Sequence, residues 1–266
     1  MNYTFGLIGS GNMGGAIARA ASRSVQDGIL SDHDQEKAKA LATQLGFTAG
    51  DSQEAAKESR YLFLGVKPHL MATVLEGIAP TLAQRAEPPI LVSMAAGLTI
   101  PQLQAMAGKA YPVIRIMPNT PVSVGQGVIL YTASPEATPA MVEGFLSILS
   151  QSGKVYPIEE SLMDVGAAVS GCGPAYAYLV MDALADGGVA CGLPRPDAIR
   201  YAAQTLLGAA QMVLETGKHP DQLKNEVCSP GGSTIQGVRT LEQRGVRAAM
   251  MDAVIAACEK NAALGG

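Results

Sequence analysis

The apolar residues of the first 159 positions fall into short runs separated by helical patterns. Most of these runs lack alternation of apolar and polar residues, which is typical of parallel strands covered on both faces. The predicted strands are residues 4–8, 29–31, 61–66, 90–93, 113–117, 127–131 and 155–158. Helical patterns lie between them, for example at residues 13–24, 35–45 and 139–150. Strands and helices in alternation predict an α/β domain with a doubly wound, mostly parallel sheet.

The pattern changes after Glu159, beyond which no convincing strand follows. Pro174 and Pro196 stand where a proline opens a helix, and Gly217 is a typical C-terminal cap of the second of these helices. Further helical patterns start after residue 232 and cover residues 246–263. The sequence therefore predicts two domains, an α/β domain at 1–159 and an all-α domain at 160–266.

Composition adds a reason for self-association. The chain has 266 residues, of which 48% are apolar and only 16% are charged, whereas about 25% is usual for charged residues. The alanine-rich helices of the second domain carry little charge, even on the face opposite their apolar side. They predict more burial than about 105 residues achieve alone, and hence helices from a second subunit. The alternative is that these helices only pack on the sheet domain.

Several classes of protein are excluded or disfavoured by the sequence. The net charge of −4 argues against a nucleic-acid binder that works by bulk positive charge. The long uncharged stretches at 88–108 and 116–135 are interrupted by prolines and polar residues, so we expect no membrane span. We also expect no signal peptide, because no basic region precedes an apolar one near the first residues. The four cysteines form no CxxC pair, so we expect reduced thiols, no metal site and a cytoplasmic location.

The first predicted strand is followed by a glycine-rich turn and then a helix. The turn reads Gly9-Ser10-Gly11-Asn12-Met13-Gly14, which is GxGxxG in the context that makes it a dinucleotide-binding fingerprint. Gly9 permits the tight turn, Gly11 lets a pyrophosphate approach the backbone, and Gly14 lets helix and strand pack closely. The sequence therefore predicts a Rossmann domain that binds NAD(H) or NADP(H).

The end of the second strand normally selects between these two cofactors. An acidic residue there binds the ribose 2′-hydroxyl of NAD, whereas a basic residue accommodates the 2′-phosphate of NADP. Asp32 lies in this window and disfavours a phosphate, while Ser31 and His33 are able to donate to one. Alternatively, Asp32 or Asp34 simply caps the helix that starts near Gln35.

Other motifs carry candidate chemistry. Two segments follow predicted strands, where ligands of open α/β sheets bind: Val66-Lys67-Pro68-His69 and residues 115–121. Alternatively, each is only a loop that contains prolines. In the helical half, Gly231, Gly232, Ser233 and Thr234 stand at a helix N-terminus. Free amides there make a site for a carboxylate, or the segment is an ordinary capped helix start.

Together these motifs resemble the delta-1-pyrroline-5-carboxylate reductase family. The matching pieces occur in family order and span nearly the whole chain: GSGNMG, GVKPH, SMAAGLTI, RIMPNTP, SGCGPAYAY, DALADGGVACGLPR and VCSPGGSTIQGV. The resemblance implies an N-terminal Rossmann domain, an all-α dimerisation domain that interlocks with a second subunit, and a substrate site at the dimer interface. Homodimers or higher assemblies of dimers are expected.

The resemblance also implies roles for single residues. Cofactor contacts fall on the Gly9–Gly14 loop and on Val66, Lys67, Pro68, Ala95 and Ala96, and Asn119 is expected near the nicotinamide; Asp32 is a cofactor candidate from its position after the second strand alone. Binding of the substrate carboxylate falls on Ser229, Gly231, Gly232, Ser233 and Thr234, with the Thr234 hydroxyl reaching the ring nitrogen. Glu160 aligns with a position that contacts the product, or is a solvated connector acid. Asp32 and His33 depart from the common family pattern, which puts a strict NADPH preference in doubt.

The implied reaction is hydride transfer from NAD(P)H to the C=N bond of 1-pyrroline-5-carboxylate, a cyclic imine carboxylate, which gives L-proline in the last step of its biosynthesis. Thr234 is the catalytic candidate. Three alternatives remain: a β-hydroxyacid dehydrogenase-like enzyme, a reductase of a related cyclic imine, and a non-catalytic NAD(P)-binding regulator. The first of these uses a lysine on the first long helix of the second domain, and residues 164–193 contain none.

Overall fold

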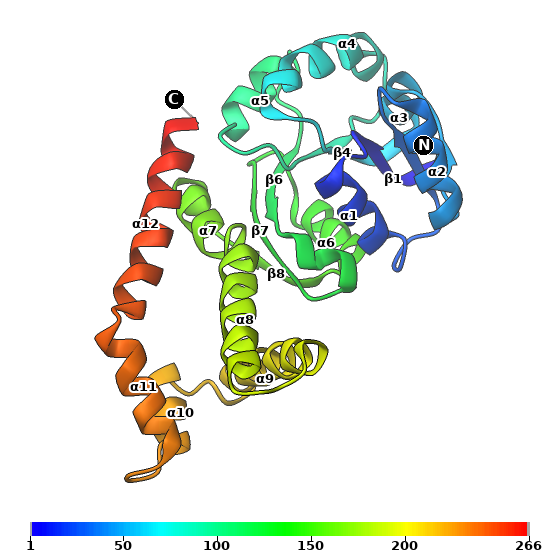
Figure 1. The fold of residues 1–266 in the computed structure, drawn as a ribbon. Coiled ribbons are helices and arrows are strands. Elements are labelled where there is room, and N and C mark those ends of the chain that lie inside the picture. Colours follow the sequence, from blue (N-terminus) through cyan, green and yellow to red (C-terminus); the bar gives the residue numbers. More distant parts are fainter. Residues whose placement is uncertain (1, 265–266) are drawn as a thin grey trace. The chain divides into compact units, whose positions relative to one another are not determined.

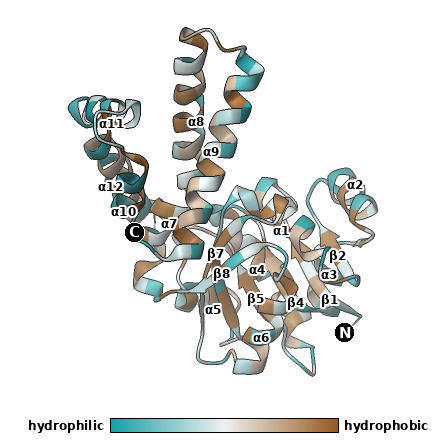
Figure 2. Cartoon of the chain, turned by 90° about the horizontal axis from the view of Figure 1, so that it is seen from below, coloured by the Kyte–Doolittle hydropathy of each residue, from teal (hydrophilic) through white to brown (hydrophobic). Residues whose placement is uncertain are grey.

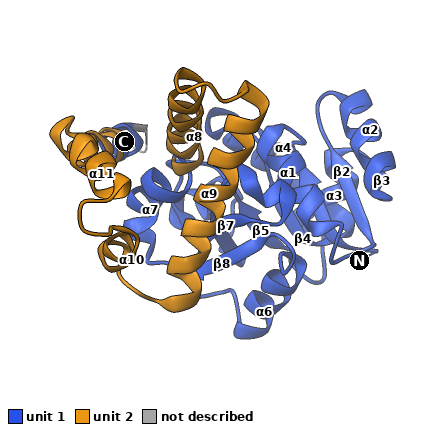
Figure 3. Ribbon diagram, turned by 60° about the horizontal axis from the view of Figure 1, so that its bottom comes forward, with its two compact units in different colours: residues 1–172, 257–266 blue, residues 173–256 orange. Residues whose placement is uncertain are grey.

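The computed structural model describes residues 2–264, which form two compact units (Figure 3). The first unit comprises the chain up to Cys172 together with the residues from Ala257 on, and the second comprises Gly173–Ala256. None of the described helices is long and apolar enough to cross a membrane.

The first unit is built on an eight-stranded sheet with the order β3-β2-β1-β4-β5-β6-β7-β8 (Figure 1). The part from β3 to β6 is parallel and has the strand order of a Rossmann fold, β7 is antiparallel to β6, and β8 is parallel to β7. The mostly parallel α/β fold predicted from the sequence is therefore confirmed. The strands are β1 Tyr3–Ile8, β2 Gly28–Ser31, β3 Thr48–Ala49, β4 Ser59–Leu64, β5 Ile90–Ser93, β6 Val113–Pro118, β7 Gly127–Ala133 and β8 Gly153–Pro157.

Helices lie on both faces of this sheet. The α-helices of the first unit are α1 Asn12–Ala21, α2 Gln35–Leu45, α3 Ser52–Glu58, α4 Met71–Ala83, α5 Ile100–Met106, α6 Pro139–Ile148 and α7 Met163–Ser170. Short 3-10 helices are η1 Pro68–Leu70, η2 Thr120–Val124 and η3 Glu160–Leu162. One hydrophobic core joins the sheet to α1, α2 and α6, and a second core joins it to α3, α4 and α5.

The central strands feed both cores, because successive side chains of a strand point to opposite faces. In β1, Phe5 and Leu7 belong to the first core and Ile8 to the second. In β4, Tyr61 and Phe63 face the first core, whereas Leu62 and Leu64 face the second. Burial on both faces explains why these strands are continuously apolar in the sequence.

The second unit is helical. Its helices are α8 Gly173–Ala190, α9 Arg195–Thr216, α10 Pro220–Val227, α11 Ser233–Gln243 and the first part of α12 Val246–Leu264. Gly217 caps α9 with a φ of 64°, as the sequence predicts. The Tyr176 hydroxyl of α8 donates a hydrogen bond to the carbonyl oxygen of Ala253 in α12 over 3.2 Å.

The second unit has almost no core of its own. Within residues 173–256, the only buried apolar side chains are Ala185, Ala198 and Ala202. Large apolar side chains are exposed instead, among them Leu179 at 69% and Leu214 at 71%. Figure 2 shows hydrophobic segments along α8 and α9. Exposed apolar surface of this extent marks an interaction site.

Candidate functional site

The glycine-rich turn between β1 and α1 is tightly packed. Gly9 has a φ of +97°, a conformation that other residues rarely adopt. A Cβ atom on Gly14 would lie 2.0 Å from the carbonyl oxygen of Gly9, so only glycine fits at position 14. Gly9 and Gly14 therefore have the structural roles that the sequence predicts: Gly9 permits the tight turn, and Gly14 permits close packing against it.

A further glycine completes this turn. Gly65 follows β4, and its N–H donates to the carbonyl oxygen of Ile8 over 2.8 Å. A Cβ atom at position 65 would lie 2.4 Å from the carbonyl oxygen of Gly9. Gly65 is not among the site residues predicted from the sequence, although it directly precedes Val66 and Lys67 in the GVKPH motif, where a glycine at the end of a buried strand is a signal.

The N-terminus of α1 suits a dinucleotide pyrophosphate. No side chain caps this helix, and its first turn carries no acidic residue. A Cβ atom on the capping residue Gly11 would meet nothing within 4 Å among residues 2–264, so no contact within that part of the chain requires glycine there. A glycine at this position leaves room for a ligand to approach the amides of Asn12, Met13 and Gly14 closely. The residues present therefore fit NAD(P)H.

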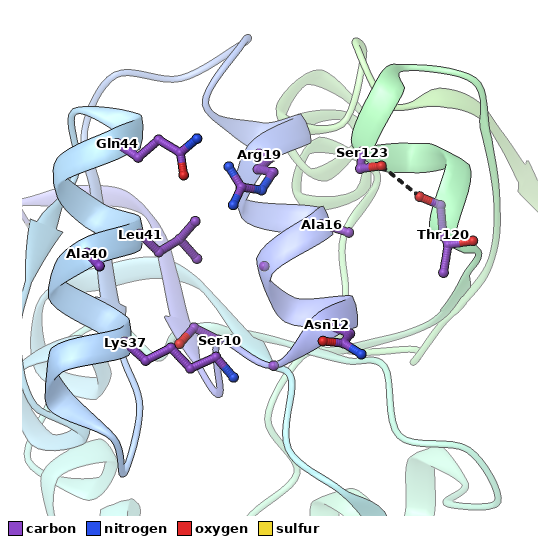
Figure 4. A pocket seen from close by; sticks show the side chains of 12 residues that line it. Ser10, Asn12, Ala16, Arg19, Lys37, Ala40, Leu41, Gln44, Thr120 and Ser123 are labelled. Atoms are coloured by element: carbon purple, nitrogen blue, oxygen red, sulfur yellow. Dashed lines mark hydrogen bonds between the residues drawn. The ribbon is translucent and has the colours of Figure 1, made fainter.

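Two cavities flank the glycine-rich turn. One, of about 450 Å³, is lined by Gly9, Asp32, Val66 and Lys67 and lies at the ends of β2 and β4, while Pro68 begins η1 just beyond it. The other, of about 490 Å³, runs between α1, α2 and η2 and includes Ser10 and Asn12 (Figure 4). The structure thus brings most of the predicted cofactor residues together around one turn.

Asp32 is tied to this turn rather than to α2. Its Oδ2 accepts hydrogen bonds from the Ser10 N–H at 2.6 Å and the Ser10 hydroxyl at 2.9 Å, and its Oδ1 accepts from the Asp34 N–H at 3.1 Å. The residue that caps α2 is Asp34, which accepts from the Lys37 N–H. Burial raises the pKa of Asp32, but these hydrogen bonds and neighbouring His33 outweigh it, so that pKa lies below its ordinary value.

A third cavity, of about 210 Å³, lies beyond the ends of β5 and β6. Its lining includes Ala96, Met117, Cys172 and Asn261. Ala95, the neighbouring predicted residue, is itself buried. Asn261 belongs to the last turns of α12 and donates to the carbonyl oxygen of Asp164 over 3.1 Å. Nothing in the sequence signalled that the end of the chain contributes to this part of the first unit.

The side chain of Asn119 holds the end of β6 in place. Its Nδ2 donates to the carbonyl oxygen of Ser170 over 2.9 Å, and its Oδ1 accepts from the Val128 N–H over 2.9 Å. Asn119 is 6% exposed. The amide therefore joins β6, β7 and α7, and a contact between Asn119 and the nicotinamide stays a prediction.

Glu160 is neither free nor simply solvated. Its Oε1 accepts a hydrogen bond from the Ile100 N–H at the start of α5 over 2.7 Å and lies 3.5 Å from Nη1 of Arg115. Arg115 is buried in β6, and its Nη2 also pairs with Asp164 over 3.2 Å. The interpretation of Glu160 as a solvated connector acid is therefore wrong, while its contact with product stays a prediction.

The Arg115 cluster leads to a stability prediction. Removing a buried charge partner leaves two carboxylates without their cation, and the cost is about 3 kcal/mol. We expect Arg115→Met to lower the free energy of unfolding in urea by about that amount. The control is Arg200→Met, which removes an exposed arginine paired with Asp197 and is expected to cost less than about 1 kcal/mol. Equal losses in the two variants would contradict a structural role of the cluster.

The predicted substrate residues lie in the second unit, on the loop before α11. Gly231 has a φ of +70°, and a Cβ on Gly232 would lie 2.3 Å from Oγ of Ser229. The Gly232 N–H donates to the Ser229 carbonyl oxygen over 3.1 Å, which closes the loop. No side chain caps α11, and its first turn carries no acid. Ser233 and Thr234 are exposed there, so the structure groups these residues around one open helix N-terminus.

Comparison with known proteins shows which family this chain resembles. Residues 160–264 match the family model described as pyrroline-5-carboxylate reductase dimerisation, and residues 4–97 match that described as NADP oxidoreductase coenzyme F420-dependent. The chain is 40% identical to the pyrroline-5-carboxylate reductase of Escherichia coli, with 98% of both chains covered. It is also 40% identical to that of Pisum sativum, covering 98% of this chain and 95% of the relative.

This chain belongs to the pyrroline-5-carboxylate reductase family. The family assignment makes it an NAD(P)H-dependent oxidoreductase that acts on a C=N bond. A solved pyrroline carboxylate reductase of Plasmodium falciparum with NADP bound is similar over 100% of both chains, with 32% identity and a TM-score of 0.88. The match of residues 160–264 to a dimerisation domain supports self-association of the helical half.

Proposed function

We propose that this chain reduces 1-pyrroline-5-carboxylate to L-proline, the last step of proline biosynthesis. The observation that carries the proposal is the similarity over essentially the full length to two pyrroline-5-carboxylate reductases at 40% identity. Each unit also has a structural feature that suits one of the two ligands. In both units, a helix N-terminus without a side-chain cap lies beside a glycine-rich loop.

We propose that the first domain, residues 1–159, holds the cofactor. The amides after Gly11 bind the pyrophosphate, and Ser10, Val66, Lys67 and Pro68 form the walls around the nucleotide. Ala95, Ala96 and Asn119 lie at the ends of β5 and β6, where the nicotinamide is expected. The support for this assignment is that these strand ends and the glycine-rich turn share one edge of the parallel sheet, the usual ligand edge of such folds.

We propose that the second domain, residues 160–266, binds the substrate. Free amides at the start of α11 and the hydroxyls of Ser229 and Ser233 bind the imine carboxylate. The glycines at 231 and 232 keep this loop open. The Thr234 hydroxyl hydrogen bonds to the ring nitrogen. Glu160 retains one carboxylate oxygen without a hydrogen bond among residues 2–264, which is free to contact the product.

This reaction needs little general acid or base catalysis by side chains. When bound, NAD(P)H supplies the hydride. A protonated imine is already electrophilic, so the chain's residues chiefly bind and orient the two reactants. The three histidines of the chain, His33, His69 and His219, all lie outside the Ser229–Thr234 loop. We propose that Thr234 relays a proton through water to the imine nitrogen, so that the hydride adds to the carbon of a protonated C=N bond and leaves a neutral amine.

A spectrophotometric assay tests the proposal directly. Purified protein is mixed with pyrroline-5-carboxylate and either NADH or NADPH, and the loss of nicotinamide absorbance is followed. We expect oxidation that depends on the imine. Binding of cofactor without any such oxidation would favour a non-catalytic regulator, and faster oxidation with a six-membered or sulfur-containing imine would favour a different substrate. Oxidation of a β-hydroxyacid in place of imine reduction would favour the dehydrogenase alternative.

We further propose that the chain forms a homodimer, alone or in larger assemblies, through its helical half. The exposed apolar side chains of α8 and α9 support this proposal, because residues 173–256 bury only three alanines among their apolar side chains. We also propose a cytoplasmic location, which fits four cysteines that are all free thiols. Cell fractionation tests the location, and recovery outside the cytosolic fraction would contradict it.

Sedimentation of matched variants tests the dimer. We expect the wild-type chain to sediment as a dimer or a larger assembly. Leu179→Glu places a charge on α8 where the native side chain is 69% exposed, and we expect it to reduce the assembly state. Val124→Glu changes a side chain of the first unit that is 70% exposed, and it serves as the control that stays assembled. A stable wild-type monomer would contradict the proposal.

A further inference from the structure

The carboxylate of Asp32 is already saturated by hydrogen bonds within the chain. Ser10 donates two bonds to Oδ2 through its N–H and its hydroxyl, while the Asp34 N–H and Nδ1 of His33, the latter at 2.7 Å, contact Oδ1. A carboxylate offers about four acceptor positions, so these contacts leave little capacity for a ribose hydroxyl. The side chain is also 5% exposed. The Asp32 carboxylate is thus turned toward the glycine-rich turn.

Lys37, unlike Asp32, has an exposed side chain without an ion pair within residues 2–264. It stands in the first turn of α2, fixed there by the bond from its N–H to Asp34 Oδ1 over 3.1 Å. Its side chain is exposed, forms no ion pair within residues 2–264 and lines both cavities beside the glycine-rich turn. Figure 4 shows it extending from α2 toward Ser10.

The remaining acids around the first cavity are engaged by backbone amides. Asp34 accepts from Lys37, and Asp51 accepts from the Glu54 N–H over 2.8 Å, each as the cap of a helix. Asp51 lines the cavity with Asp32, so the cavity's two carboxylates both have backbone donors. The ammonium group of Lys37 is therefore free to meet an anion at the end of β2.

We infer that Lys37 is the cationic partner of the 2′-phosphate of NADPH and that Asp32 is a positioning residue that anchors the glycine-rich turn. Asp32 therefore does not impose a preference for NADH, even though its position after β2 is that of an NAD-selecting acid. The inference rests on the proposed use of NAD(P)H. It extends that proposal by naming a residue on α2 that binds the 2′-phosphate.

Direct cofactor binding tests the role of Lys37. The chain contains no tryptophan, so the fluorescence of the reduced nicotinamide is a clean signal for titration without imine. We expect Lys37→Met to weaken NADPH binding by about tenfold, because a charge-assisted contact is lost, and to change NADH binding by less than about twofold. The matched control is Lys39→Met, two residues along α2 and outside both cavities, which leaves both affinities unchanged. Equal effects of Lys37→Met on both cofactors would overturn the inference.

Asp32→Asn tests the other half of the inference by the same titration. An anchor of the turn serves both cofactors, so we expect both to bind more weakly and their affinity ratio to stay within about twofold of wild type. A selector would behave differently, since removing its charge would relieve repulsion of the phosphate. A rise of about tenfold in the preference for NADPH would therefore overturn the assignment.

These titrations separate the inference from the proposed function. If the protein binds NADPH in a way that depends on Lys37 but does not reduce pyrroline-5-carboxylate, the proposed function fails and the assignment of Lys37 stands. If imine reduction occurs but Lys37→Met leaves NADPH binding intact, the assignment fails and the proposed function stands.

Discussion

Gly14→Ala is expected to weaken binding of both NADH and NADPH by about 5- to 150-fold, because overpacking costs about 1–3 kcal/mol and each 1.4 kcal/mol is tenfold. The new Cβ atom would lie 2.0 Å from the carbonyl oxygen of Gly9 and 3.1 Å from its carbonyl carbon. Backbone atoms cannot move aside as a flexible side chain does. Either α1 must shift away from the turn or Gly9 must leave its conformation, and both changes displace the amides that bind the pyrophosphate.

Gly15→Ala is the matched control for this prediction. It lies one residue further along α1, and its Cβ would meet Leu41 and the Ser10 carbonyl oxygen only at 3.6 Å, an ordinary contact. We expect unchanged cofactor affinity and a helix stabilised by up to about 1 kcal/mol. Nicotinamide fluorescence measures affinity, and circular dichroism checks that both variants are folded. Wild-type affinity in Gly14→Ala would contradict the proposed position of the pyrophosphate.

Thr234→Ala is expected to lower turnover with pyrroline-5-carboxylate by well over tenfold, because a positioned proton transfer contributes about 100- to 10,000-fold to the rate. Thr234 is exposed at the start of α11, and its hydroxyl makes no hydrogen bond among residues 2–264. The fold therefore does not depend on that hydroxyl. Loss of activity with an unchanged unfolding transition would identify a functional role.

Two further variants sharpen the test of Thr234. Thr234→Ser keeps the hydroxyl and is expected to retain most of the turnover. Thr240→Ala removes a hydroxyl from the same helix, one that donates to the Gln236 carbonyl oxygen over 3.0 Å, and is expected to leave turnover unchanged. Wild-type activity in Thr234→Ala would remove this residue from the mechanism.

Local patterns predicted the elements whose signals are complete within a few residues. Helix α2 begins at Gln35 and ends at Leu45 as predicted, because Asp34 caps its start and Gly46 ends it in the left-handed conformation. The strand β5 also has its predicted ends. Helix α1, in contrast, ends at Ala21 and not at residue 24, because Arg23 and Ser24 donate to carbonyl oxygens three residues back in a tightened last turn.

Elements with weak local signals are not predictable from the sequence alone. The strand β3 has two residues and is fixed by its pairing with β2, which no run of apolar residues reveals. Helix α10 is polar, and its start depends on Nδ1 of His219, which accepts from the Asp221 N–H over 3.2 Å. The strand β4 is shifted relative to the predicted 61–66, since it ends at Leu64, where Gly65 packs against the glycine-rich turn.

The sequence by itself determined the Rossmann order of elements, the glycine-rich turn and the loop before α11, because each depends on spacing and on residue types that carry their own conformational restrictions. It also indicated the missing core of the helical half through low charge and abundant alanine. The tertiary structure decided how functional side chains are used. It turned Asp32 toward Ser10, joined Glu160 to Arg115 and left Lys37 free. The physical reason is that many of a side chain's hydrogen-bond partners come from strands and helices distant in the sequence, and only the folded structure brings one of them within bonding distance.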